Sequence, residues 1–174
     1  MAKKVLPAVE PRGARRNRLR GDRTLLNQLL DDEQIRALDC LQWFRETSFL
    51  HTRELGEAAE RPTKDSIFDE AFEHYLASIR RLQGSEVPVL TTAPRGRAVT
   101  AWVSTPLWAQ LRSLSESLGL PLSRVTGAAL QQHLAAQVTP AMQKLRAECL
   151  RKAATLYAGR SSKTPRPRSP RRKA

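Results

Sequence analysis

The sequence is poor in cysteine and aromatic residues and has no long apolar run, and each shortage excludes a class of protein. Its two cysteines, Cys40 and Cys149, are far apart and sit in helical patterns among apolar neighbours. We therefore expect two buried thiols, and neither a disulfide nor a metal site. No apolar stretch approaches the roughly 20 residues that span a bilayer, and the basic N-terminus lacks the apolar stretch of a signal peptide. These features predict a cytoplasmic protein that is not attached to a membrane.

Signatures of catalysis are lacking as well. The histidines, His51, His74 and His133, are widely separated without metal-ligand spacing, so we expect each to be exposed or hydrogen-bonded. The chain has no glycine-rich phosphate loop, and no nucleophile stands beside a recognisable base and orienting group. These absences favour a binding protein over an enzyme, and they favour one without metal or cofactor.

Positive charge is abundant but unevenly distributed. The formal net charge is +13 at pH 7, of which residues 1–20 carry +6 and residues 160–174 carry +7. Between these tails, residues 21–93 carry −6 and residues 94–159 carry +6. Nucleic acid, a polyanion, is attracted to the basic half and to both tails and is repelled by the acidic half. A basic tail alone is equally explained as a solubilising appendage, and the segregated charge between the tails favours nucleic acid.

Composition and periodicity divide the chain into five segments, which are residues 1–23, 24–84, 85–96, 97–159 and 160–174. The first and last are basic, contain proline and lack a hydrophobic period, so we expect them to be disordered without a partner. The second is an acidic helical module, because its apolar residues from Leu25 to Phe44 recur at steps of three and four. Asp31 and Asp32 are placed to cap a second helix in this module. The third segment contains two prolines, which disfavour helix, and it is therefore predicted to be an extended linker.

The fourth segment begins with the best candidate for a strand. Residues 98–103 form a short alternating stretch, and Thr105-Pro106 then starts a helix that Gly119 ends. A turn at residues 120–123 opens a second helix, with Ser123 as its cap, and Thr139-Pro140 starts a third helix that ends near Gly159. The predicted fold class is therefore mainly α.

This strand has no obvious partner in the chain. A single strand cannot satisfy its hydrogen-bonding groups or bury its inner face alone, and the nearest identical partner is a second copy of the protein. Two antiparallel copies would form a two-stranded ribbon, which fits the major groove of B-DNA. We therefore expect a homodimer, or a higher oligomer, that binds double-stranded DNA.

The order of these elements resembles the ribbon-helix-helix family, to which repressors of the MetJ and Arc type belong. The resemblance covers residues 97–136, from the strand Arg97–Val103 through the helix start at Ser104–Leu107 to the Gly119-Leu120 turn and the second helix. It implies a dimeric domain whose alternate strand residues face the DNA groove. It also implies that the N-terminal backbone of the second helix holds a phosphate.

The resemblance assigns individual residues to DNA. Alternation puts Val99, Ala101 and Val103 on the core side and Ala98, Thr100 and Trp102 on the base-facing side. Only Thr100 is a conventional hydrogen-bonding reader. Trp102 has two readings of about equal weight, contact with bases or packing under a neighbouring segment.

Further DNA contacts are expected from cations outside the strand. Arg95 and Arg97 stand at the approach to the strand, and Ser123 and Arg124 stand where a helix end and a cation could meet a phosphate oxygen. The tail is expected to make contacts with phosphates that do not depend on sequence, through Arg160, Lys163, Arg166, Arg168, Arg171, Arg172 and Lys173.

Two functional hypotheses follow. The first is a sequence-specific DNA-binding protein, either a transcriptional repressor or an accessory factor of a plasmid or mobile element, in a conjugative relaxosome or in partition. The second is a helical adaptor that recruits a protein partner through residues 24–84 and holds nucleic acid non-specifically through its tails. Only the first predicts a specific site that survives competition from excess random DNA.

Overall fold

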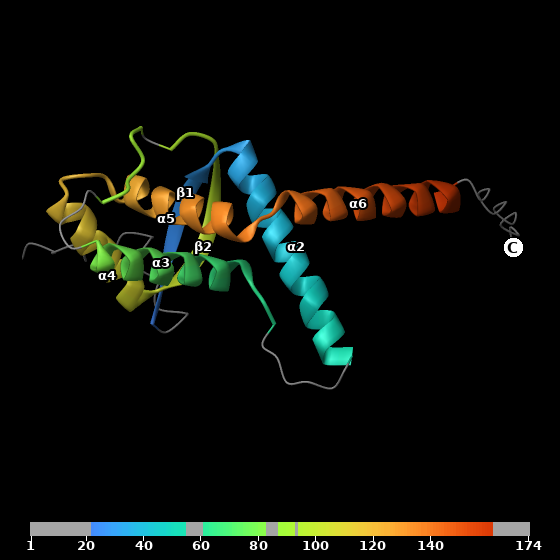
Figure 1. The fold of residues 1–174 in the computed structure, drawn as a ribbon, viewed down its shortest axis with the longest axis horizontal. Helices are drawn as coiled ribbons and strands as arrows, with labels where there is room; N and C mark the ends of the chain where they lie inside the picture. Colours follow the sequence, from blue (N-terminus) through green and yellow to red (C-terminus); the bar gives the residue numbers. More distant parts are fainter. Residues whose placement is uncertain (1–21, 55–60, 83–86, 93, 162–174) are drawn as a thin grey trace, which may run out of the picture.

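The computed structural model describes residues 22–54, 61–82, 87–92 and 94–161, which form mainly helices and one small sheet (Figure 1). A strand followed by two helices occurs twice along the chain, and a long helix is added after the second set. The elements are β1 (Arg23–Leu30), α2 (Asp32–Glu54), α3 (Lys64–Arg81), β2 (Arg97–Ser104), α4 (Thr105–Ser117), α5 (Leu122–Gln137) and α6 (Pro140–Ser161).

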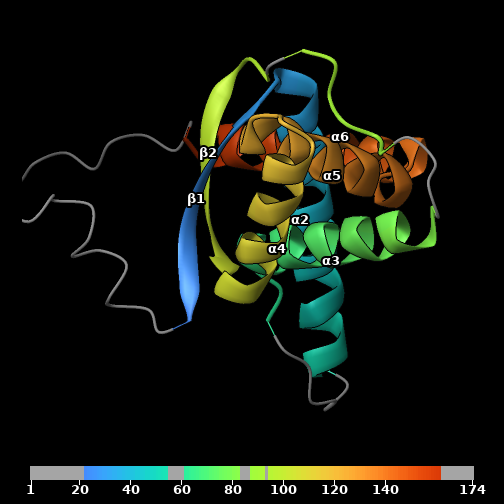
Figure 2. The ribbon, with the colours of Figure 1, turned by 90° about the vertical axis from the view of Figure 1, so that its left-hand side faces the viewer.

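The two strands pair with each other in antiparallel orientation. Asn27 lies opposite Thr100 near the middle of this ribbon, and the helices lie behind one of its faces (Figure 2). The prediction that the helical pattern begins at Leu25 is therefore wrong for residues 23–30, which form β1. The prediction that the strand at residues 97–103 lacks a partner in its own chain is wrong for the same reason, because β1 is that partner. The main argument for a homodimer is removed with it.

Leucine spacing explains why β1 resembles a helix in the sequence. Leu25, Leu26, Leu29 and Leu30 repeat at intervals of four, which suits one stripe of a helix. In the structure the strand alternates instead, with Leu26, Gln28 and Leu30 buried and Asn27 and Leu29 exposed. Gln28 breaks the apolar alternation that would have indicated a strand.

Side chains cap three of the described helices, and α5 lacks the cap that was predicted for it. The Asp31 carboxylate accepts a hydrogen bond from the Gln34 N–H at 2.7 Å, which confirms the predicted helix start after it. Thr63 forms a capping box with Ser66 at the start of α3. Thr139 accepts from the Met142 N–H at the start of α6. The prediction of Ser123 as a cap is wrong, because the N-cap of α5 is Pro121 and no side chain caps this helix.

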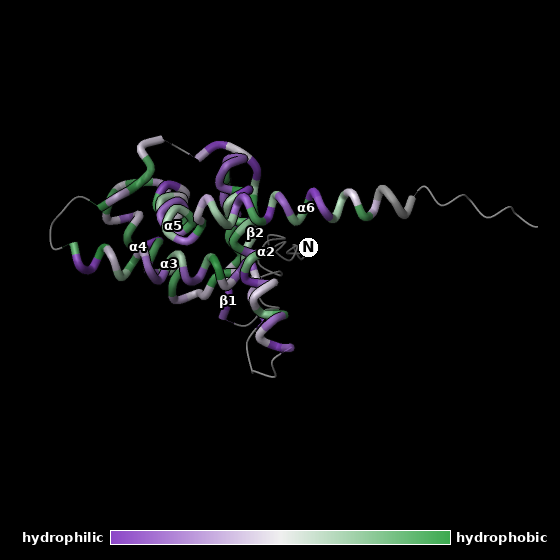
Figure 3. The backbone as a smooth tube through the Cα atoms, turned by 45° about the vertical axis from the view of Figure 1, so that its right-hand side comes forward, coloured by the Kyte–Doolittle hydropathy of each residue, from purple (hydrophilic) through white to green (hydrophobic). Residues whose placement is uncertain are grey.

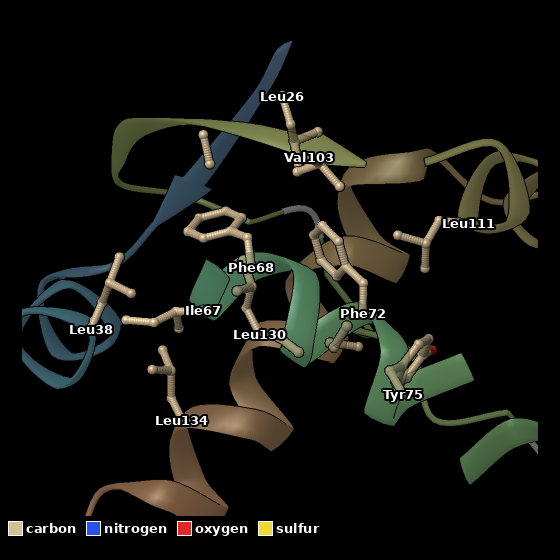
Figure 4. Packing of buried hydrophobic residues seen from close by; sticks show 14 of the residues in the cluster. Leu26, Leu38, Ile67, Phe68, Phe72, Tyr75, Val103, Leu111, Leu130 and Leu134 are labelled. Atoms are coloured by element: carbon tan, nitrogen blue, oxygen red, sulfur yellow. The ribbon is translucent and has the colours of Figure 1, made fainter. Parts of the chain in front are cut away.

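One hydrophobic core joins the two strand-helix-helix sets. Figure 4 shows Phe68 and Phe72 from the first set close to Val103 from the second, and Leu38 from the first set close to Leu134 from the second. Helix α3 packs against α5, and both lie behind the ribbon. Because core residues from Leu26 to Leu76 pack with core residues from Ala101 to Leu134, the described part of the acidic segment and the strand at residues 97–104 belong to one packed body.

Gly96 allows the second strand to start against the end of the first. Its backbone φ is 138°, a conformation that side chains rarely allow, and a Cβ built there would lie 1.9 Å from the Leu30 carbonyl oxygen. Only glycine permits this approach of the two backbones.

The linker before β2 is held on both sides. The Tyr75 hydroxyl on α3 donates to the Pro88 carbonyl at 2.6 Å, and burial raises the pKa of Tyr75 to about 12. On the other side, the Arg124 side chain on α5 donates to the carbonyls of Leu90 and Thr91, at 2.6 and 2.9 Å. The described part of the linker is therefore fixed to the helices that back the ribbon.

Helix α6 crosses α2 and then extends away from the other elements (Figure 1), and hydrophobic and hydrophilic residues alternate along it (Figure 3).

The two cysteines differ in exposure. Cys149 on α6 is exposed and Cys40 on α2 is buried, so the prediction of two buried thiols is wrong for Cys149. Among the helices of the described segments, none combines the length and the apolar character needed to cross a bilayer.

Candidate nucleic-acid interface

The outer face of the ribbon is the candidate site. Ala101 and Val103 are buried against the helices and Val99 is half-buried, whereas Ala98 and Thr100 are exposed, as the predicted alternation requires. The register adds residues from β1 to this face, because each outward residue of β2 lies opposite one of β1. The outer face is therefore made by the pairs Leu25 and Trp102, Asn27 and Thr100, and Leu29 and Ala98.

The central pair of this face is polar and internally bonded. The Thr100 hydroxyl donates to the side-chain oxygen of Asn27 at 2.8 Å, and both side chains are exposed. This bond occupies the Thr100 proton and leaves the amide group of Asn27 with its N–H donors. The centre of the ribbon thus offers donors to acceptor atoms in a groove.

Apolar side chains flank the central pair. Trp102 is half-buried opposite Leu25, and Leu29 keeps 41% of its surface exposed opposite Ala98. The two readings of Trp102 both retain support, because alternation puts it on the outer face while part of its surface is covered. Apolar groups at such positions suit contact with the methyl group of thymine.

Carboxylates of α3 bind the outer edge of β2. Asp65 accepts a hydrogen bond from the Trp102 N–H at 3.0 Å, and Asp69 accepts one from the Ser104 N–H at 2.9 Å. The guanidinium of Arg23 donates to Asp69 at 2.5 Å and also to the Trp102 carbonyl. Two acidic groups of the negatively charged half are thus used to protect a strand edge and to hold a cation next to the ribbon.

The arginines at the other end of the ribbon are accessible. Arg95 and Arg97 are both exposed, at the start of β2. Arg97 contacts Asp32 at 3.3 Å, but both side chains are more than two-thirds exposed, so this pair is weak and readily exchanged for another anion. These two predicted contact residues are placed beside the candidate face.

The residues at the start of α5 bind other parts of the protein, which the sequence did not predict. Arg124 is bound to the linker carbonyls described above, so the structure gives it a protein partner where a phosphate was predicted. Ser123 is half-buried, and its carbonyl accepts from the side-chain amide of Gln28. Gln28 is fully buried, and its oxygen accepts from the Thr126 hydroxyl at 2.5 Å. These bonds fix α5 to the inner face of β1.

The predicted tail contacts cannot be placed on this site. The backbone of Arg160 belongs to α6, its side chain lies outside the described residues, and so do all the other tail residues of the predicted set, from Lys163 to Lys173.

Sequence reasoning missed half of the candidate face, namely Leu25, Asn27 and Leu29. A signal for it exists in the repeated order of elements. An Arg-Gly pair precedes each strand, at residues 20–21 and 95–96, and a helix begins directly after each strand. A search for this internal repeat could have indicated a second strand in the same chain.

No family model, curated protein or solved structure matches the chain.

Proposed function

We propose that the protein binds specific sites on double-stranded DNA, using a ribbon-helix-helix arrangement built from a single chain. The observation that carries this proposal is the exposed outer face of an antiparallel ribbon whose other face is packed on helices. A two-stranded ribbon has the width of the major groove, where outward side chains meet base edges. Residues 23–81 would supply one strand-helix-helix unit and residues 97–137 the other.

Charge supports DNA as the partner. The chain carries +13 in total, and the seven basic residues among residues 1–20 precede β1 directly in the sequence. Arg23, Arg95 and Arg97 add cations at the two ends of the ribbon. The carboxylates nearest to β2, Asp65 and Asp69, are engaged with backbone N–H groups and Arg23, which reduces their repulsion of phosphates.

In this proposal the protein is a regulator that binds either the operator of a gene or a site on a plasmid or other mobile element. Both roles require the same chemistry, which is positioning by phosphate contacts and discrimination by contacts to base edges. Neither role requires catalysis.

Competition binding tests the proposal. A bound site is first selected from random duplexes with the full-length protein, and its affinity is then measured at fixed salt against excess random DNA. Replacing Thr100 by alanine should reduce discrimination by about 1–3 kcal/mol while leaving the thermal melt unchanged, because the exposed Thr100 hydroxyl holds the Asn27 side chain whose amide is proposed to meet the bases.

A threonine away from the ribbon provides the matched control. Thr47 on α2 is also exposed and hydrogen-bonded through its hydroxyl, so Thr47→Ala removes the same atoms without touching the ribbon. The proposal fails if no duplex is enriched over random DNA, or if the two alanine variants lose discrimination equally.

A further inference from the structure

The two strands of the ribbon present different side chains to the outside. β1 contributes Leu25, Asn27 and Leu29, and β2 contributes Ala98, Thr100 and Trp102. In a ribbon made from two identical chains the outward residues of both strands are necessarily the same. Here they differ at every position.

The register of the two strands shows which outward residues occupy equivalent positions. Asn27 and Thr100 lie opposite each other, and each stands five residues before the first residue of the following helix, Asp32 or Thr105. The two strands are therefore related by an approximate two-fold axis that passes between these residues. On one side of this axis lies the pair Leu25 and Trp102.

On the other side of the axis lies the pair Leu29 and Ala98. The first side carries a large aromatic ring next to leucine, and the second carries leucine next to a single methyl group. The surrounding charges differ too, since Arg23 is held near the first side by Asp69, while Arg95 and Arg97 stand at the second. An approximate symmetry of the backbone thus carries an asymmetric chemical surface.

We propose that the ribbon recognises a non-palindromic duplex site in one fixed orientation, with one protein chain in the groove. This inference rests on the proposed function. The centre of the site would offer acceptor atoms, such as guanine O6 and N7 or thymine O4, to the amide donors of Asn27. The flank under Leu25 and Trp102 brings a half-buried leucine and aromatic ring to the groove, and the flank under Leu29 and Ala98 brings an exposed leucine and an exposed methyl group, so the two flanks meet thymine methyl groups with different apolar surfaces.

Selection from random duplexes, followed by footprinting, gives the first test. The expected consensus differs from its own reverse complement, and the mass of the complex corresponds to one chain per site. Two palindromes are then built, one from each half of the consensus. The protein should bind either palindrome about tenfold more weakly than the selected site, because one half of each meets the wrong flank.

A double variant tests which residues set the orientation. A98L combined with W102L gives both flanks the same pair of leucines, so its preference for the selected site over the palindromes should fall to near unity. The matched control makes the same two exchanges on α4, outside the ribbon, as A109L combined with W108L. The control should keep the preference of the unchanged protein, and thermal melts verify that both variants fold.

The outcomes separate this inference from the proposed function. A palindromic consensus bound by two chains overturns the inference and leaves specific DNA binding intact. An asymmetric consensus whose preference survives in the A98L/W102L variant overturns the assignment of orientation to these flanks. The absence of any enriched duplex overturns the proposed function and the inference together.

Discussion

The two strand-helix-helix units share an order of elements but differ in charge and in construction. Residues 21–93 carry −6 and residues 94–159 carry +6. In the first unit, α2 has 23 residues and extends away from the sheet, whereas α4 in the second unit has 13 (Figure 1). Each second helix also binds the opposite strand in its own way, α3 through carboxylates and α5 through a hydroxyl and a carbonyl.

This difference shows that the acidic unit supplies one of the two strands of the ribbon and also stabilises the other. Its carboxylates Asp65 and Asp69 satisfy backbone groups at the edge of the basic unit's strand. A negative half that repels nucleic acid in isolation is compatible with DNA binding when carboxylates next to the ribbon, such as Asp65 and Asp69, are bonded within the protein. The comparison can be tested by disturbing each unit where it meets the other.

The largest effect is expected from a charge on the inner face of β1. Leu30 is fully buried, so Leu30→Asp places an unpaired carboxylate in the shared core and should remove most of a stability of roughly 5–15 kcal/mol. Leu29→Asp is the neighbouring control, because Leu29 is 41% exposed on the outer face. Circular dichroism melts measure both variants. A folded Leu30→Asp protein beside an unfolded Leu29→Asp protein would show that the register of β1 is shifted by one residue.

An intermediate effect is expected at the edge of β2. Asp69→Ala removes the acceptor of the Ser104 N–H and one of the two acceptors of the Arg23 guanidinium, and hydrogen bonds to charged groups are worth about 1.5–3 kcal/mol. Glu73→Ala, one turn further along α3, removes an exposed carboxylate and should change stability by less than about 0.5 kcal/mol. Urea titrations compare the two variants. Equal losses would mean that the acidic unit does not stabilise the strand edge.

The smallest effect is a dependence on pH at the contact between α3 and α5. Burial lowers the pKa of His133 from 6.5, as do the charges of Arg45 and His74, while Glu70 acts in the opposite direction. The unfolded chain therefore binds more protons at this residue than the folded protein, so stability should fall as the pH drops below about 6.5. His133→Leu should flatten this fall, and His51→Leu, at an exposed histidine, should not.

The carboxyl group of Glu70 titrates in a separate pH range and does not obscure the test of His133. Glu70 accepts two hydrogen bonds from Arg45, at 2.6 and 2.7 Å, and these bonds lower the pKa of Glu70 from its ordinary value of 4.5. Its contribution to stability is lost only as the pH falls below that value. A loss of stability that begins near pH 6.5 and persists in the His133→Leu variant would contradict the assignment to His133.

The sequence predicts the second unit better than the first. The alternation in residues 97–103 and the caps and prolines after it are local signals, and the structure places a strand and the predicted helices there. Three of the six residues on the candidate face, Ala98, Thr100 and Trp102, follow from that alternation. The role of the face in DNA binding stays a prediction.

The start of the first unit was decided by tertiary structure. Residues 24–30 fit a helical stripe through their leucines, and their strand alternation is interrupted by Gln28. Gln28 is tolerated on the inner face because its amide meets the Thr126 hydroxyl and the Ser123 carbonyl, which are far away in the sequence. A buried amide is costly without such partners, and no local pattern announces them. Composition, charge distribution and most helix boundaries were thus determined by the sequence alone, whereas the identity of β1, and with it a ribbon within one chain, depended on contacts between residues 98 positions apart.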